Sequence, residues 1–252
     1  MSSWQIIEGD SVAIVRTLPA ESRRVIVCDP PYGKGHYKTD KDVCVAALLP
    51  VVAEARTVAL KGYPINVHQW LPALGLTPEE WIAWYPTNYA AKAGGRWKSL
   101  PKWHEDIVVC GAVPGAKRLK QERVRAGISA SKKHAGKNWD PASGSAIGDV
   151  WTDAAPGIGF LSERRLHANE SPVSLMLKLV ELCSNPGDTI LDPFAGSASL
   201  GVACLRLGRH YIGIEVFPEW AALCRERLAA EEAGSTMEAS RAGQLPLLGG
   251  AG

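Results

Sequence analysis

The chain has 252 residues, of which 46% are hydrophobic and 21% are charged, and its formal net charge is +2. This composition excludes a disordered or fibrous protein and favours one folded domain with an insertion. No apolar run approaches the roughly 18 residues needed to span a bilayer, and the N-terminus lacks a basic patch followed by an apolar run, so we expect a cytoplasmic protein.

The first part of the chain predicts a strand, a short helix from Ser11 to Leu18 and an apolar strand from Val25 to Cys28. Because that strand is continuously apolar, we expect helices to cover both of its faces. We then expect a helix over 43–59, a strand around Ile65, and strands within 79–90 and 104–113. Residues from about Gly111 to Val150 show little periodicity and indicate an insertion or a small lobe.

After Leu166 the pattern predicts a helix over 171–184, a strand over 189–194, a helix over 200–208, a strand over 211–216 and an amphipathic helix over 217–233. Strands that alternate with helices indicate an α/β fold, a doubly wound Rossmann-like open sheet with right-handed crossovers. We divide the chain at 1–110, 111–150 and 151–232, followed by a tail over 233–252 that is rich in Gly, Ala and Ser.

The six cysteines are scattered without a C-x-x-C pair, and several lie in apolar runs. We expect reduced, mostly buried thiols and neither disulfides nor a metal site.

A glycine-containing loop in the last third predicts a cofactor site. Gly196 lets the backbone approach a ligand closely, and Glu215, at the end of the next strand, can accept hydrogen bonds from both hydroxyls of a ribose. The spacing alone leaves a dinucleotide, S-adenosylmethionine and a simple tight turn open. The loop contains one glycine where a phosphate cradle has three, which favours a cofactor without phosphates.

The stretch Asp29-Pro30-Pro31-Tyr32 follows the apolar strand directly. The Asp29 carboxylate and the Pro30 carbonyl form an acceptor pair that can hold a primary amine by its two protons, and Tyr32 can stack on the ring that bears the amine. The alternative is a turn that ends the strand with a surface aspartate.

These two motifs, DPPY and LDPFAGSAS, resemble those of the DNA amino-methyltransferases, which transfer a methyl group from S-adenosylmethionine to the exocyclic nitrogen of adenine or cytosine. The catalytic motif precedes the cofactor motif, as in the β-class. The segments EGDSVAIVRTLPAESRRVIVCDPPY, KWHEDIVVCG and HANESPVSLMLKLVELCSNPGDTILDPFAGS also resemble blocks of this family. The resemblance implies a methyltransferase fold with a catalytic half at 1–110, a target-recognition insertion at 111–150 and a cofactor-binding half at 151–232.

The resemblance assigns roles to individual residues. Around the target base it places Asp29, Pro30, Pro31 and Tyr32. Around S-adenosylmethionine it places Asp10 at the adenine, Asp192, Phe194, Ala195, Gly196 and Ser197 at the methionine end, Glu215 at the ribose, and His167, Asn169 and Glu170 on the opposite side. Two residues depart from the family pattern: Ala198 stands where a second glycine is usual, and Ser171 where a lysine is common. The extra methyl of Ala198 would be tolerated in a helical conformation.

The insertion is strongly basic, which suits a polyanion. The cations that we assign to double-stranded DNA are Lys117, Arg118, Lys120, Arg123, Arg125, Lys132, Lys133 and Lys137. Trp139 can wedge or stack against a base. A flexible surface loop is the alternative for this segment.

The resemblance favours adenine N6 as the acceptor, because an aspartate before the two prolines is commoner among adenine enzymes and a serine among cytosine-N4 enzymes. The target base must leave the duplex before transfer. No cysteine follows the prolines, which argues against methylation of a ring carbon. Cytosine-N4 methylation, an RNA or protein amide substrate, and a binding protein without turnover stay open, as does the presence of a restriction partner.

Two further partners are predicted. β-class relatives are often homodimers, and Gln244–Leu248 resembles the short peptides that dock on bacterial sliding clamps. The alternative for that peptide is an ordinary tail.

Overall fold

The computed structural model describes residues 2–31, 48–86, 104–116, 120–121, 145–146, 148–153 and 170–237. Within these ranges no helix combines the length and apolar character needed to cross a membrane.

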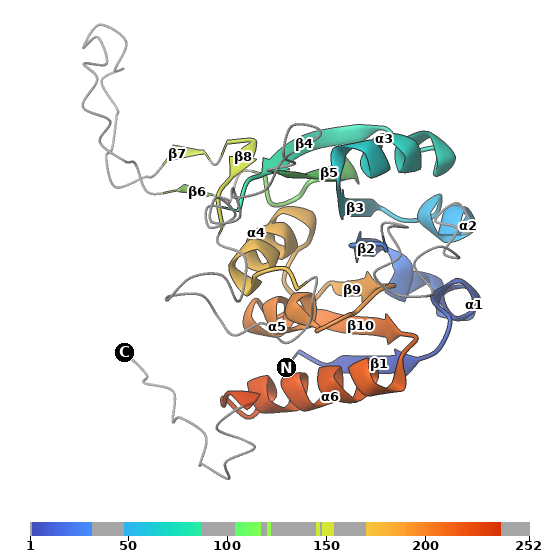
Figure 1. The fold of residues 1–252 in the computed structure, drawn as a ribbon, viewed down its shortest axis with the longest axis vertical. Coiled ribbons are helices and arrows are strands. Elements are labelled where there is room, and N and C mark those ends of the chain that lie inside the picture. Colours follow the sequence, from blue (N-terminus) through green and yellow to red (C-terminus); the bar gives the residue numbers. More distant parts are fainter. Residues whose placement is uncertain are drawn as a thin grey trace, which may run out of the picture.

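A mixed sheet of eight strands forms the centre of the molecule, in the order β1-β10-β9-β2-β3-β5-β4-β8 (Figure 1). The strands are β1 (Trp4–Glu8), β2 (Val25–Cys28), β3 (Thr57–Gly62), β4 (Pro78–Trp84), β5 (Glu105–Gly111), β8 (Val150–Trp151), β9 (Thr189–Asp192) and β10 (His210–Glu215). All neighbours are parallel except the two pairs that β5 makes with β3 and β4. The α/β class and the open sheet predicted from the sequence are confirmed.

Six α-helices are described: α1 (Ser11–Val15), α2 (Leu49–Val52), α3 (Pro64–Ala73), α4 (Val173–Cys183), α5 (Ser199–Arg206) and α6 (Pro218–Glu232). A short 3-10 helix covers Ala20–Arg23, and β6 (Lys120–Gln121) pairs with β7 (Ser145–Ala146) in a separate two-stranded sheet.

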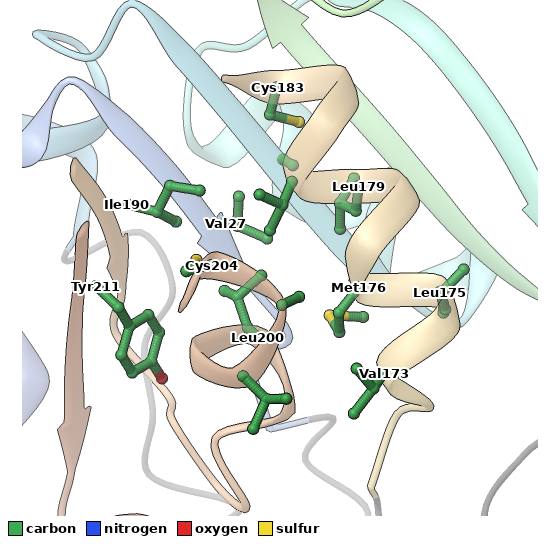
Figure 2. Close-up of a cluster of buried hydrophobic side chains, with 14 of the residues drawn as sticks. Val27, Val173, Leu175, Met176, Leu179, Cys183, Ile190, Leu200, Cys204 and Tyr211 are labelled. Atoms are coloured by element: carbon green, nitrogen blue, oxygen red, sulfur yellow. The ribbon is translucent and has the colours of Figure 1, made fainter. Parts of the chain in front are cut away.

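Two apolar layers enclose the sheet, and β2 contributes to both. Val25 and Val27 belong to the same apolar layer as residues of α4, α5 and α6, and Figure 2 shows Val27 beside residues of α4 and α5. Ile26 and Cys28 pack with residues of α1, α2 and α3. Alternate side chains of a strand point to opposite faces, so a strand covered on both sides must be apolar throughout. Of the six cysteines, the five in the described ranges are buried, free thiols.

Of the helix predicted over 43–59, the described residues contain only α2 (Leu49–Val52), and the prediction of a strand around Ile65 is wrong. Thr57–Gly62 forms the completely buried strand β3, and Ile65 lies in α3, which begins at Pro64. A short apolar run does not distinguish a buried helix from a buried strand by periodicity, whereas a proline in the first turn is typical of a helix start.

The first and last described elements adjoin. β1 pairs with β10 at one edge of the sheet, α6 packs against β1, and the indole nitrogen of Trp4 donates to the Glu232 carboxylate at 3.0 Å.

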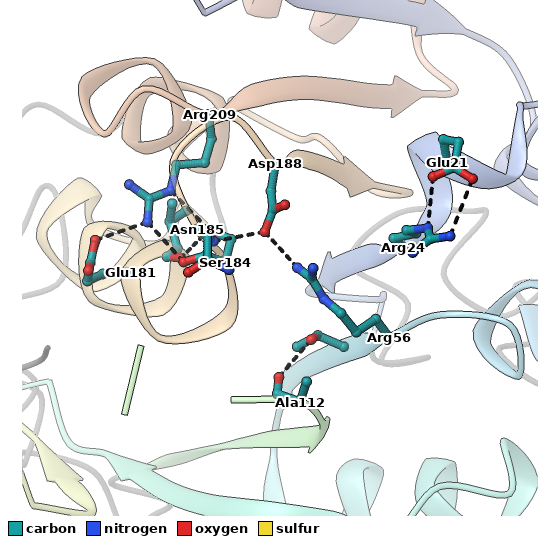
Figure 3. A network of polar contacts seen from close by, with 11 residues as sticks. Glu21, Arg24, Arg56, Ala112, Glu181, Ser184, Asn185, Asp188 and Arg209 are labelled. Carbon is teal, nitrogen blue, oxygen red and sulfur yellow. Dashed lines mark hydrogen bonds and ion pairs between the residues drawn. The ribbon is translucent and has the colours of Figure 1, made fainter. Parts of the chain in front are cut away.

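Polar contacts link the amino ends of the central strands (Figure 3). The guanidinium of Arg56, just before β3, donates to the carboxylate of Asp188, just before β9, at 2.6 Å. The Thr57 hydroxyl donates to the Ala112 carbonyl at 2.7 Å.

The carboxyl ends of the parallel strands lie on the opposite side of the sheet from these contacts. There β9 and β2 are adjacent, while the chain continues from β9 to β10 on one side and from β2 to β3 on the other. Such a switch point is where open α/β sheets bind their ligands.

Candidate active site

Asp29 follows β2 at this switch point and is held by a lysine on the neighbouring strand. Lys61 Nζ donates to Asp29 Oδ2 at 2.8 Å, and the Ser171 hydroxyl donates to the same oxygen at 3.4 Å. The Asp29 side chain is 29% exposed, so a ligand can reach it, whereas the Lys61 side chain is 4% exposed. Pro30 is buried and Pro31 half-buried, and Tyr32 lies outside the described residues.

A second carboxylate, Asp192, ends β9 and is buried. Its Oδ1 accepts the amide of Phe194 at 3.1 Å, and its Oδ2 accepts the hydroxyl of Tyr211 at 2.9 Å. Burial raises the pKa of Asp192 to about 7, assisted by the negative charges of Asp29 and Glu215 and opposed by the two donors. Asp29, Asp192 and Glu215 therefore form one acidic group at the carboxyl edge of the sheet.

Glu215 ends β10 and binds the glycine loop. Its Oε2 accepts the amide of Gly196 at 2.9 Å, and its Oε1 accepts the amide of Phe217 at 3.0 Å. Burial raises the pKa of Glu215, although these amides act in the opposite direction. Each carboxylate oxygen has two lone pairs, so both oxygens keep acceptor capacity for a ligand hydroxyl.

Gly196 leaves open space beside the backbone. Its φ is 55°, and a Cβ built on it would meet no atom closer than the Phe194 carbonyl oxygen at 4.0 Å. The buried Ala195 and Ser197 flank it. A ligand can therefore approach the main chain closely at this point.

Arg227 of α6 holds the rest of this loop. Its Nη1 donates to the Glu170 Oε1 at 2.6 Å, to the Ser197 carbonyl at 2.9 Å and to the Ser199 hydroxyl at 3.3 Å. Both Glu170 and Arg227 are largely buried. The Glu170 carboxylate thus ties the start of the segment before α4 to the loop before α5.

Ala198 adopts a left-handed conformation, with φ 57° and ψ 30°. It is the one non-glycine residue with positive φ in the described part of the chain. We expected the Ala198 methyl to be tolerated in a helical conformation. Ala198 does not adopt that conformation, because the turn into α5 requires the left-handed region.

The remaining predicted residues divide into two groups. Asp10 is exposed and caps α1, where its Oδ1 accepts the Ala13 amide at 2.9 Å, and the neighbouring Gly9 amide donates to the Glu215 carbonyl at 2.9 Å. This contact places Asp10 at the same edge as Glu215. Lys120 begins β6. The other predicted residues lie outside the described ranges, namely His167, Asn169, Lys117, Arg118, Arg123, Arg125, Lys132, Lys133 and Lys137.

The family model of the N6/N4 DNA methylases matches residues 24–226, which include β2, β9, β10 and the carboxylates that end or follow them. The chain belongs to the N6/N4 DNA methylase family.

Two relatives of this methylase align over most of its length. The DNA adenine methyltransferase YhdJ of Escherichia coli (strain K12) is 27% identical over 252 residues, which cover 88% of this chain and 82% of the relative. The type II methyltransferase M.HpaI of Haemophilus parainfluenzae is 26% identical over 246 residues, which cover 90% and 74%.

Solved structures share the fold of the methylase. The M1.HpyAVI–SAM complex superimposes with a TM-score of 0.59 at 18% identity, covering 89% of this chain and 100% of that one. The PvuII DNA methyltransferase, described as cytosine-N4-specific, gives 0.60 at 14% identity, covering 89% and 86%.

Sequence reasoning missed several residues of the methylase site, including Lys61, Glu105 and Arg227. Lys61 carried a usable signal, because it is a lysine inside an apolar run, but the first residues of its strand were predicted as the end of a helix. Ser171, where a lysine is common, lies beside Asp29 without a charge, and Lys61 supplies the cation from β3. Arg227 gave no signal, because arginines in an amphipathic helix are ordinarily exposed.

Proposed function

We propose that this methylase transfers a methyl group from S-adenosylmethionine to the exocyclic N6 of adenine in DNA. The observation that carries the proposal is the Asp29 carboxylate, accessible at the end of β2, fixed by a buried lysine and adjacent to the acidic group of Asp192 and Glu215. The adenine assignment is supported by the aspartate before the prolines and by the relative named as a DNA adenine methyltransferase.

The described residues fit S-adenosylmethionine. The open space beside Gly196 admits a ligand against the main chain, and Glu215 can accept from ribose hydroxyls. The Asp192 carboxyl is placed for the methionine end, where its ionised form suits the ammonium group. When bound, the cofactor supplies an electrophilic methyl group on a positively charged sulfur.

The chain's own residues would orient the acceptor amine. The Asp29 carboxylate and the Pro30 carbonyl would accept hydrogen bonds from its two N–H groups, so that the nitrogen lone pair points away from them. Asp29 would stabilise the positive charge that develops on the nitrogen as the N–C bond forms and the methyl–sulfur bond breaks, until the amine releases one proton. A flipped base costs a few kcal/mol of lost stacking and pairing, which Tyr32 would offset by stacking.

The test is transfer of labelled methyl from S-adenosylmethionine to unmethylated genomic DNA, followed by nucleoside mass spectrometry. We expect N6-methyladenine from the wild type, none from Asp29→Ala, and an unchanged yield from Glu54→Ala, which alters an exposed carboxylate at the other edge of the sheet. N4-methylcytosine without N6-methyladenine would reassign the base. Binding of DNA without label would indicate a binding protein, and label in RNA alone would change the substrate.

We also propose that the basic insertion contacts double-stranded DNA. Removing one phosphate-contacting cation should lower the slope of log affinity against log salt concentration by about 1. Lys117→Ala and Lys132→Ala test this, and slopes equal to that of the wild type would refute it.

Two further partners belong to the proposal. Analytical ultracentrifugation tests whether the protein is a homodimer. For the sliding clamp, deletion of Gln244–Leu248 should abolish binding, and unchanged clamp affinity would dispose of that contact.

A further inference from the structure

Lys61 is placed between two carboxylates by the register of three strands. Cys28 of β2 pairs with Leu60 of β3, so Asp29 and Lys61 are the next residues on adjacent parallel strands. β5 runs antiparallel to β3 and brings Glu105 to the same place. The ammonium of Lys61 donates to both carboxylates, at 2.8 Å to Asp29 and also to Glu105.

The surroundings of Lys61 restrict its position. Its ammonium lies over the ring of Trp84 at 5.0 Å from the centroid. Burial alone would lower the pKa of Lys61, but the charges of Asp29 and Glu105 raise it above its ordinary value, so the cation is retained. The Lys61 and Glu105 side chains are 4% and 14% exposed, against 29% for Asp29. The bridge is therefore buried at Lys61 and open to solvent at the end that meets the substrate.

We propose that Lys61 is a positioning residue for methyl transfer: it orients the Asp29 carboxylate through their hydrogen bond, and Glu105 holds Lys61 in turn. The inference rests on the proposed role of Asp29 in holding the target amine. Lys61 itself acts through Asp29.

A purely structural role does not account for the lysine at position 61. Replacing buried ion pairs by apolar side chains is often neutral or stabilising, so stability alone does not explain a lysine here. The chain contains a comparison, because Lys178 of α4 donates to Asp153 at 2.8 Å and lies 5.8 Å from the centroid of the Trp151 ring. This second lysine has a carboxylate and an indole as Lys61 does, but neither of its partners belongs to the site described above.

The experiment compares Lys61→Met, Lys61→Arg and Lys178→Met in steady-state methylation of DNA, with S-adenosylmethionine affinity measured by calorimetry. We expect Lys61→Met to lower kcat about 10- to 100-fold, as misplacing a supporting group does, while cofactor affinity changes less than about threefold. Lys61→Arg should restore part of kcat, and Lys178→Met should stay within about twofold of the wild type.

The comparison of kcat with cofactor affinity gives a readout that a structural role would not move. Loss of a merely structural contact would lower stability and leave kcat of the folded protein near that of the wild type. Glu105→Gln removes one of the two carboxylates that hold Lys61 but leaves Asp29 its cation, so it should lower kcat less than Lys61→Met does.

A Lys61→Met protein with kcat equal to that of Lys178→Met would overturn the inference while leaving the proposed function intact. A wild type that transfers no methyl to DNA would instead refute the proposed function and the inference with it. If Lys61→Met does not fold, Lys61→Arg and Glu105→Gln decide, and kcat equal to that of the wild type in both variants overturns the inference.

Discussion

The Glu215 carboxylate accepts the amide hydrogen of Gly196 at 2.9 Å, so the acid that ends β10 also fixes the loop that follows β9. The other oxygen of Glu215 accepts the amide of Phe217. A carboxylate suits this position because it accepts at both oxygens, whereas a glutamine must direct its NH₂ toward one of the two amides.

Glu215→Gln should therefore weaken S-adenosylmethionine binding about 10- to 100-fold, the equivalent of losing one hydrogen bond to a charged group. Calorimetric titration measures it. Glu219→Gln is the matched control, because Glu219 is an exposed acid in the first turn of α6. The affinity of this variant for S-adenosylmethionine should differ from that of the wild type by less than about twofold. Equal affinities in the two variants would contradict this role of Glu215.

Asp192 makes stability depend on pH. Its pKa is raised by burial from 3.8 to about 7 in the folded protein. Its stabilising contribution is complete below the unfolded pKa and is lost as the pH rises through about 7, because the folded state then gives up a proton that it binds more tightly than the unfolded chain does. We expect wild-type unfolding free energy to fall by a few kcal/mol more than that of Asp192→Asn between pH 5 and 8. Urea unfolding at several pH values measures the difference, and parallel curves would refute it.

Ala198→Gly tests the left-handed turn before α5. Ala198 and Ala203 are both fully buried, so changing either to glycine removes a buried methyl and adds the same freedom to the unfolded chain. Only Ala198 has positive φ. Ala198→Gly should accordingly be more favourable than Ala203→Gly by about 1–2 kcal/mol, measured by urea unfolding. Equal effects would mean that the turn stores no strain.

Arg227→Met should destabilise the protein by about 3–5 kcal/mol, because it leaves the buried Glu170 carboxylate without this cation. Adding Glu170→Gln should recover much of the loss. Arg206→Met is the control, since Arg206 binds Glu231 through two hydrogen bonds at 2.7 and 2.8 Å but is 48% exposed, and we expect less than about 1 kcal/mol. Thermal and urea unfolding report both values. Similar losses for Arg227→Met and Arg206→Met would show that the buried contact is no stronger than the exposed one.

The sequence predicted the structure best where a local pattern of residues determines it. The strand Val25–Cys28 was predicted with its bounds, and Glu215 was correctly expected at the end of the strand after the glycine loop. Both are segments in which an apolar run ends at a polar or turn residue.

The sequence predicted least where the role of a residue depends on contacts with residues that are distant in the chain. The run that contains Lys61 was assigned to the wrong elements, so its position beside Asp29 could not be derived. The bridge to Glu105 requires β5 to be antiparallel to β3, and the contact of Arg227 with Glu170 joins residues 57 positions apart. Pairing of strands and burial of charges are tertiary properties that composition and periodicity do not encode.

The contact between Trp4 and Glu232 has a consequence for the architecture of such chains. Because the first strand and the last helix touch, a short linker could join these two points and new ends could be opened between β6 and β7, with every strand of the eight-stranded sheet keeping its neighbours. In that permuted chain the glycine loop would precede the two prolines, yet Asp29, Asp192 and Glu215 would meet at the same edge. The order in which the motifs are read along the chain is thus separable from the geometry of the site.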